Sequence, residues 1–211
     1  MKMSMKNPNN QLERALSFYY SENLRFHSVT SLNIEEAQAI LSALFEIPIN
    51  VIIKKINENN IHDKFYPHDI PQFSSLDDCF TSIIKLVHSG LDGVSFQKIG
   101  YFLRTIQRKR GADFKYGENH SKCAALMGLC HIDKGVWTNP FSFAFERLDI
   151  TAQSLLRPKL CLRIPLIQAF YKHNKSQEFL ELSLTCLSDS TMIRRKPNVI
   201  KLINVVEESL I

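Results

Sequence analysis

One stretch of the chain, residues 95–145, constrains the fold more than any other. It begins with a short apolar segment, S-F-Q-K-I-G-Y-F-L-R, which a basic turn, R-K-R-G, separates from a second segment with helical spacing. Apolar residues three and four apart, followed by Gly128 as a stop signal, predict that this second helix runs from about 115 to 127. Residues 130–137 and 141–145 then have the character of two short strands.

The order helix, basic turn, helix and hairpin predicts a winged helix-turn-helix, a mainly α fold in which the second helix of the motif enters a DNA groove. The hairpin is the wing, with turns expected at Lys134-Gly135 and at Thr138-Asn139-Pro140. We divide the chain into a helical region at 1–71 for packing or dimerisation, a winged helix at 72–150, and a helical region with a second helix-turn-helix-like pattern at 151–211.

Signals for the ends of helices recur along the chain. Asn33, Ser75 and Ser95 each precede an apolar helical pattern and are expected to be N-caps. A helix that Asn33 opens should end before Pro48, and Gly90 should end the helix that Ser75 opens.

Prolines and polar residues predict the breaks between helices. Residues 59–75 combine histidines, prolines and polar side chains, which is typical of a connection between domains. After residue 150 we expect interruptions at Pro158 and Pro165, and Pro197 is expected to be the first residue of the last helix.

The composition is that of a globular protein. With 211 residues, 45% of them hydrophobic and 22% charged, the chain can bury a core. It lacks an apolar run of about 20 residues and a secretory signal pattern, so we expect a cytoplasmic protein without a membrane partner. Five cysteines without a C-x-x-C pair indicate reduced thiols.

Basic residues form two clusters, although the net charge is only +5. The first cluster consists of Arg104, Arg108, Lys109, Arg110, Lys115 and Lys122, against the acids Asp113 and Glu118. The second consists of Arg194, Arg195, Lys196 and Lys201. A single basic run is usually a solvated helix face, but two runs on candidate recognition helices favour phosphate binding.

These clusters supply the expected DNA-contacting residues. From the first cluster and its turn, the expected phosphate contacts are Arg108, Lys109, Arg110, Lys115 and Lys122. Hydrogen bonds to bases or backbone are expected from the exposed helix face, from Asn119, His120 and Ser121. A second phosphate contact is expected from Arg194, Arg195 and Lys196. The inner face of the same helix should bury Phe114 or Tyr116, together with Cys123, Leu126 and Met127.

Several motifs are similar to those of a known family. They are L-D-D-C-F-T-S-I-I-K-L, N-H-S-K-C-A-A-L-M-G-L, W-T-N-P-F and the distant S-D-S-T-M-I-R-R-K-P-N-V-I-K-L-I. Over residues 72–205 the chain resembles winged-helix domains that are attached to, or encoded beside, prokaryotic restriction endonucleases and defence ATPases. Thr138-Asn139-Pro140 departs from the family's tighter L-T-P, and Pro197 replaces a small residue. The resemblance implies DNA binding in a restriction or defence setting, and no catalytic residues.

Catalytic and metal sites are weaker alternatives. Asp113-Phe114-Lys115 with Asp92 has the residue types of a restriction nuclease, but the strands that would present them are missing, so Asp113 is more simply a helix cap. His120, Cys123, Cys130 and His131 are metal-ligand types without the tight pairs of a zinc site. Trp137 more often anchors a wing than stacks on a base. We therefore expect no enzyme activity, catalytic residue, metal or cofactor.

The favoured function is that of a double-stranded DNA-binding protein, the DNA-recognition component of a prokaryotic restriction or anti-phage defence system. The alternative is an adaptor that holds a nuclease or ATPase partner through its winged helix. In either case the N-terminal helices could join two copies of the chain as a homodimer.

Overall fold

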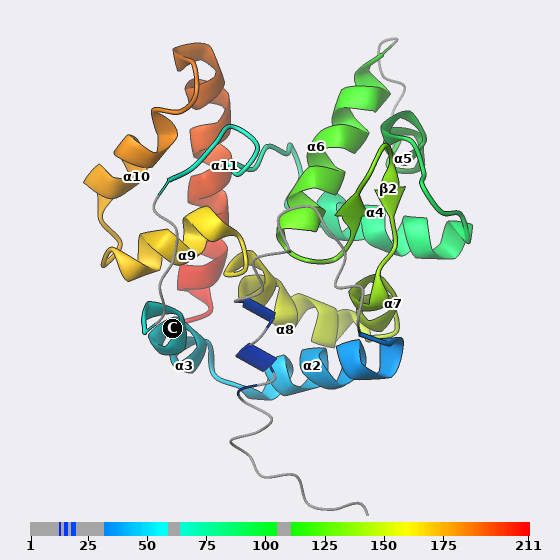
Figure 1. Cartoon of the computed structure of the whole chain (residues 1–211), viewed down its shortest axis with the longest axis horizontal. Helices are drawn as coiled ribbons and strands as arrows, with labels where there is room; N and C mark the ends of the chain where they lie inside the picture. Colours follow the sequence, from blue (N-terminus) through cyan, green and yellow to red (C-terminus); the bar gives the residue numbers. More distant parts are fainter. Residues whose placement is uncertain (1–12, 14, 17, 20–31, 59–63, 105–110) are drawn as a thin grey trace, which may run out of the picture.

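Helices dominate the computed structural model, which describes residues 13, 15, 16, 18, 19, 32–58, 64–104 and 111–211 (Figure 1). In this part of the chain ten helices accompany one two-stranded sheet, so the predicted mainly α class is confirmed. None of the described helices is long and apolar enough to cross a membrane.

Several of the first five described helices begin or end at signals that are visible in the sequence. These five helices are α2 (Ile34–Glu46), α3 (Ile49–Asn57), α4 (Leu76–Ser89), α5 (Phe96–Phe102) and α6 (Ala112–Leu126). Asn33 forms a capping box with Glu36, accepting a 2.8 Å hydrogen bond from the Glu36 N–H. Ser75 and Ser95 cap α4 and α5, and Gly90 ends α4 with φ of 60°. All four predictions are confirmed.

A small hairpin follows α6. Strands β1 (His131–Ile132) and β2 (Val136–Trp137) pair antiparallel, and Lys134 adopts φ of 51° in the turn between them, where a turn was predicted. The segment between α4 and α5 joins this hairpin, because Val94 exchanges two backbone hydrogen bonds of 2.9 and 2.8 Å with Val136.

The second predicted wing strand is wrong, since residues 141–145 lie in helix α7 (Pro140–Glu146). Their alternating phenylalanines resemble a strand, but the residues before them form a helix start. Asn139 and Ser142 make a reciprocal capping box, with hydrogen bonds of 3.0 and 2.9 Å. Pro140 then occupies the first helical position, where its missing N–H costs nothing.

Two of the three predicted proline breaks are also wrong. The C-terminal helices are α8 (Ile150–Cys161), α9 (Pro165–Lys172), α10 (Gln177–Leu184) and α11 (Asp189–Glu208). Pro165 opens α9, but Pro158 and Pro197 lie inside α8 and α11. Proline inside a helix costs about 3 kcal/mol. Burial of each large apolar side chain contributes about 1.5–3 kcal/mol, and α11 buries Val199, Leu202, Ile203 and Val206.

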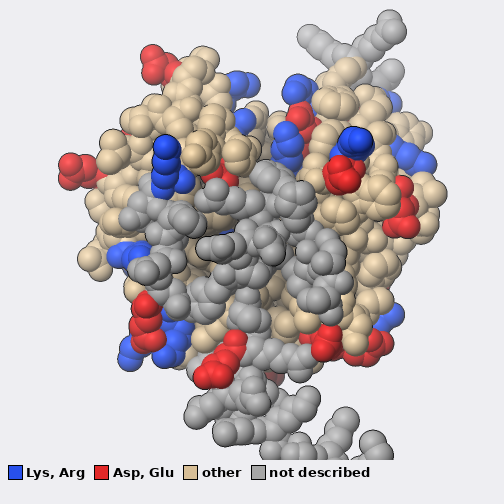
Figure 2. All heavy atoms as spheres, in the orientation of Figure 1, with Lys and Arg blue, Asp and Glu red and all other residues tan. Residues whose placement is uncertain are grey.

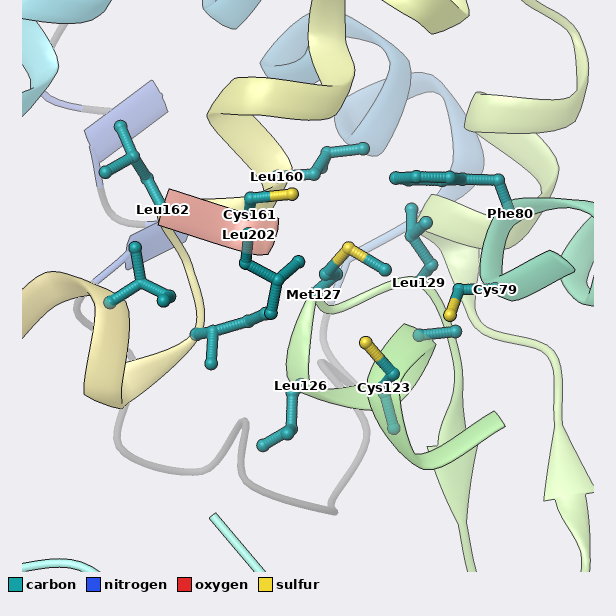
Figure 3. Packing of buried hydrophobic residues seen from close by; sticks show 14 of the residues in the cluster. Cys79, Phe80, Cys123, Leu126, Met127, Leu129, Leu160, Cys161, Leu162 and Leu202 are labelled. Carbon is teal, nitrogen blue, oxygen red and sulfur yellow. The ribbon is translucent and has the colours of Figure 1, made fainter. Parts of the chain in front are cut away.

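One core joins all three predicted regions. Helix α2 packs on α7 and α8, α4 packs on α6 and α7, and α8 packs on α11. Figure 3 shows the centre of this core, where Met127 and Leu129 lie between Phe80 of α4 and Leu202 of α11. The predicted connection is part of this packing, because Phe65, Ile70 and Phe73 are buried. The domain boundaries at 71 and 150 stay a prediction.

Candidate functional site

The two basic clusters of the sequence meet at one groove between α6 and α11, here called the α6–α11 groove. It has a volume of about 440 Å³, and residues 67–72 connect its two walls. Its described lining consists of Pro67, His68, Ile70, Pro71, Gln72, Lys115, Glu118, Asn119, Lys122, Cys123, Leu126, Arg194 and Arg195. The segment before α4 crosses from α11 to α6 in Figure 1, and Figure 2 shows Lys and Arg side chains on both sides of the hollow above it.

The α6 wall carries Lys115, Glu118, Asn119 and Lys122, which share a helix face because they are three and four residues apart. Glu118 holds both lysines, with Oε2 at 2.7 Å from Lys115 Nζ and Oε1 at 2.8 Å from Lys122 Nζ. Burial acts to raise the pKa of Glu118, but the hydrogen bonds from the two ammonium groups lower it by more. The wall therefore carries two cations and one ionised carboxylate at neutral pH.

The α11 wall carries Arg194 and Arg195, which have different surroundings. Arg194 is exposed and donates to the Ser190 carbonyl at 3.2 Å and to Thr191 Oγ1 at 3.3 Å. In the described part of the chain it pairs with no carboxylate. Arg194 is therefore the cation of the groove that is most available to an anion.

Arg195 holds the connecting segment in place. It donates to the carbonyls of Pro67 and Ile70, the latter at 2.8 Å, and to Gln72 Oε1 at 3.3 Å. Burial lowers the pKa of Arg195, as does the neighbouring Arg194, whereas Glu118 on the opposite wall raises it. Residues of both helices line this one groove, so the two walls face each other.

The groove is strongly basic. Its described lining includes four cationic side chains, Lys115, Lys122, Arg194 and Arg195, and the single carboxylate of Glu118. A cleft lined by one sign of charge focuses the electrostatic potential and attracts ligands of the opposite sign. The site therefore favours an anion with several negative charges.

His120 and Ser121 were predicted on the exposed face of the helix, but both are buried. His120 Nδ1 lies 2.7 Å from the Tyr116 carbonyl oxygen, which can only accept, so Nδ1 carries the hydrogen. Nε2 then accepts from the N–H of Ser75 at 3.3 Å and of Ser74 at 3.4 Å. His120 thus joins α6 to the start of α4 and cannot reach a ligand in the groove.

His120 and Ser121 are buried because of their positions in the helical period of α6. One stripe of the buried face of α6 consists of Asp113, Gly117, His120, Ser121 and Ala124. Residues 120 and 121 follow 113 and 117 on this stripe. The fold supplies hydrogen-bond partners for the His120 ring, whereas Ser121 Oγ is buried without one among the described residues.

The other predicted contact residues divide into three groups. Lys115, Asn119, Lys122, Arg194 and Arg195 line the groove. Lys196 does not, since it pairs with Glu181 of α10. Arg108, Lys109 and Arg110 lie outside the described residues. The predicted inner face is confirmed at Cys123, Leu126 and Met127, whereas Phe114 is exposed and Tyr116 half-buried.

Asp113 is not the cap of α6. Gly111, with φ of 81°, occupies the N-cap position, and Asp113 lies in the first turn with its carboxylate paired to Arg104. Its place in a helix differs from the strand that a nuclease Asp-x-Lys requires. Within the described ranges no three His, Cys, Asp or Glu side chains are arranged to hold a metal ion.

Trp137 anchors the hairpin, as the sequence indicated. Its Nε1 donates to the Asp133 carbonyl at 2.8 Å, and its ring packs on Gly93. A Cβ at Gly93 would lie 2.8 Å from Trp137 Cζ2, so a side chain there would displace the ring.

Two glycines that the sequence patterns did not single out set the position of α6. A Cβ at Gly117 would lie 2.0 Å from the Phe96 carbonyl oxygen, and one at Gly100 would lie 1.8 Å from that of Asp113. Helices α5 and α6 therefore touch backbone to backbone. The sequence did contain a signal for this close approach. A glycine inside a helix lowers the stability of that helix, so glycines within two consecutive helices indicate that the two backbones pack closely.

Comparisons of the chain with models of protein families, with curated proteins and with solved structures found no match.

Proposed function

We propose that this protein binds double-stranded DNA in the cytoplasm, as the DNA-recognition component of a prokaryotic restriction or anti-phage defence system. The observation that carries the proposal is the convergence of two basic clusters, far apart in the sequence, on the walls of one groove. A duplex presents closely spaced phosphates on both strands, and such a ligand matches cations held on two facing helices.

The order of elements supports α6 as the recognition helix. A winged helix consists of three helices with a hairpin after the third, and here α4, α5 and α6 precede β1 and β2. Val94, between α4 and α5, pairs with β2 as a minimal third strand. The tight crossing of α5 and α6 at Gly100 and Gly117 corresponds to the helix-turn-helix, in which the second helix contacts DNA.

Each groove residue has a role in the proposed complex. Lys115 and Lys122 exchange Glu118 for phosphate oxygens, and Arg194 adds a contact from the opposite wall. These contacts position the protein without reading the sequence. The Asn119 side chain, on the same wall, can donate and accept hydrogen bonds at a base edge.

The defence setting rests on the sequence motifs of residues 72–205 and their resemblance to winged-helix domains of restriction systems. In this proposal the protein recognises DNA and a separate subunit performs any chemistry.

A charge reversal in the groove tests the proposal. Lys122→Glu should weaken duplex binding about tenfold at low salt and lower the slope of log affinity against log salt by about 0.9, the value of one phosphate contact. Lys85→Glu is the matched control, because Lys85 is exposed on α4, outside the groove, and the change in net charge is the same. Equal binding by both variants would place the DNA surface elsewhere.

A second candidate function is the adaptor. Ile193 and Ile200, which are 74% and 39% exposed, lie seven residues apart on one face of α11 beside Arg194. Exposed apolar residues flanked by cations suit a protein partner with an acidic rim. Absence of any retardation of duplex DNA by micromolar protein at about 50 mM salt would favour this function over DNA binding.

A further inference from the structure

The polar face of α6 does not project from the surface as a recognition helix usually does. Lys115, Glu118 and Lys122 form one wall of the α6–α11 groove, which faces α11 across residues 67–72. The major groove of B-DNA is about 12 Å wide, and a helix with its side chains has a diameter of about 10–12 Å. A recognition helix therefore fills the major groove, so α11 and residues 67–72 keep a duplex at the rim of this groove and leave its interior to a narrower ligand.

The interior of the groove has the size of a smaller ligand. Its volume of about 440 Å³ lies within the range of roughly 300–1,000 Å³ that is usual for small-molecule sites. Cations line both walls, so the ligand should also carry several negative charges, as a sugar-phosphate backbone does. An unpaired strand combines a narrow cross-section with one phosphate per nucleotide.

One exposed aromatic ring lines the groove, and a second lies next to a lysine of its lining. His68 lines it with a side chain that is 50% exposed, and its ring stacks on Tyr66 with centroids 5.6 Å apart and planes 3° apart. Phe114 is 41% exposed, and the ammonium of Lys115, a groove residue, lies 5.7 Å from its ring centroid. Aromatic rings beside a basic groove are the means by which proteins hold single strands, because every base has a face that can stack.

We infer that the α6–α11 groove binds an unpaired DNA strand, with phosphates on Lys115, Lys122 and Arg194 and bases stacked on His68 and Phe114. This inference rests on the proposed function and specifies its ligand as DNA with a single-stranded segment next to a duplex. The duplex contacts the rim of the groove, where the side chains of Lys115 and Lys122 are 72% and 41% exposed. The unpaired strand enters between the walls.

Glu118 limits this binding until a strand is present. It occupies the two ammonium groups that phosphates would use, at 2.7 and 2.8 Å. A phosphate at either lysine competes with this carboxylate, and a backbone with several phosphates offsets that competition better than a single small anion does.

The test compares two fluorescent DNAs by anisotropy at fixed salt, a blunt duplex and the same duplex with a thymidine tail of about eight nucleotides. We expect the tailed duplex to bind at least about tenfold more tightly, as stacking of one or two bases would give. His68→Ala and Phe114→Ala should each remove most of this preference and leave blunt-duplex affinity unchanged.

Phe45→Ala is the control for loss of an exposed ring. Phe45 is 38% exposed, close to the 41% of Phe114, and it lies near the end of α2, a helix that contributes no residue to the groove lining. This variant should keep the preference, and thermal melting should confirm that all variants fold.

Two results separate the inference from the proposed function. Equal affinity for blunt and tailed duplex, or a preference that survives in the His68→Ala, Phe114→Ala double variant, overturns the inference and leaves duplex binding in place. Failure to bind either DNA overturns the proposed function, and the inference with it.

Discussion

The two basic clusters differ in how their cations are arranged on the helix. In α6, Lys115 and Lys122 are seven residues apart, so they lie on one face and share Glu118 as a partner. In α11, Arg194, Arg195 and Lys196 are consecutive, so each points about 100° away from the one before it. Consecutive basic residues therefore predict a high local charge. Basic residues at helical spacing predict that the charge gathers on one face of the helix.

The partners of the three consecutive cations follow from this geometry. Arg194 faces the groove, Arg195 is directed at the carbonyls of residues 67–70, and Lys196 pairs with Glu181 on α10. One basic run thus supplies a ligand-facing cation, a structural cation and a surface ion pair. The α6 cluster supplies two ligand-facing cations, both paired to the same carboxylate.

The largest expected effect is on thermal stability, and it compares the buried face of α6 with the face that lines the groove. Cys123→Asp should abolish the cooperative melting transition, because it places an unpaired carboxylate at a site with no solvent exposure. Lys122→Glu, one residue earlier, should leave Tm nearly unchanged. Circular dichroism melts measure both, with Cys123→Ala as the uncharged control. A Cys123→Asp protein that melts like the wild type would show that the inner face of α6 is misassigned.

The next largest effects distinguish Arg194 from Arg195 by the free energy of unfolding and by DNA affinity. Arg195→Ala should lower the free energy of unfolding by about 1–3 kcal/mol, since carbonyls of the connecting segment lose a charged donor. Arg194→Ala should change it by less than about 0.5 kcal/mol and weaken DNA binding instead. Urea denaturation and anisotropy titration on the same samples provide the two readouts. Equal stability losses would contradict the division of roles.

The smallest effect is expected at the third cation. Lys196→Ala removes a surface ion pair with Glu181 and should cost about 0–1 kcal/mol. The salt dependence of DNA binding should stay the same, because Lys196 does not line the groove. If the slope of log affinity against log salt fell by the value of one phosphate contact in this variant, Lys196 would contribute to DNA binding although it does not line the groove.

Local signals predicted most of the elements. Asn33, Ser75 and Ser95 each begin the helix that was expected, because a cap bonds to backbone groups only a few residues away. The period of α6 correctly predicted that Cys123, Leu126 and Met127 are buried, but it placed His120 and Ser121 on the wrong face. The strand predicted at 141–145 is wrong because Asn139 and Ser142 form a capping box that begins a helix there.

The sequence by itself determined the mainly helical class, the turn at Lys134-Gly135 and the two basic clusters. These features depend on backbone partners, periods and charges within about one or two helical turns. Only the tertiary structure decided that α6 and α11 form the two walls of one groove. It also turned His120 inward, toward Ser74 and Ser75, and Arg195 toward carbonyls more than 120 residues earlier in the chain. Such partners come from elements distant in sequence, which no local pattern of residues encodes.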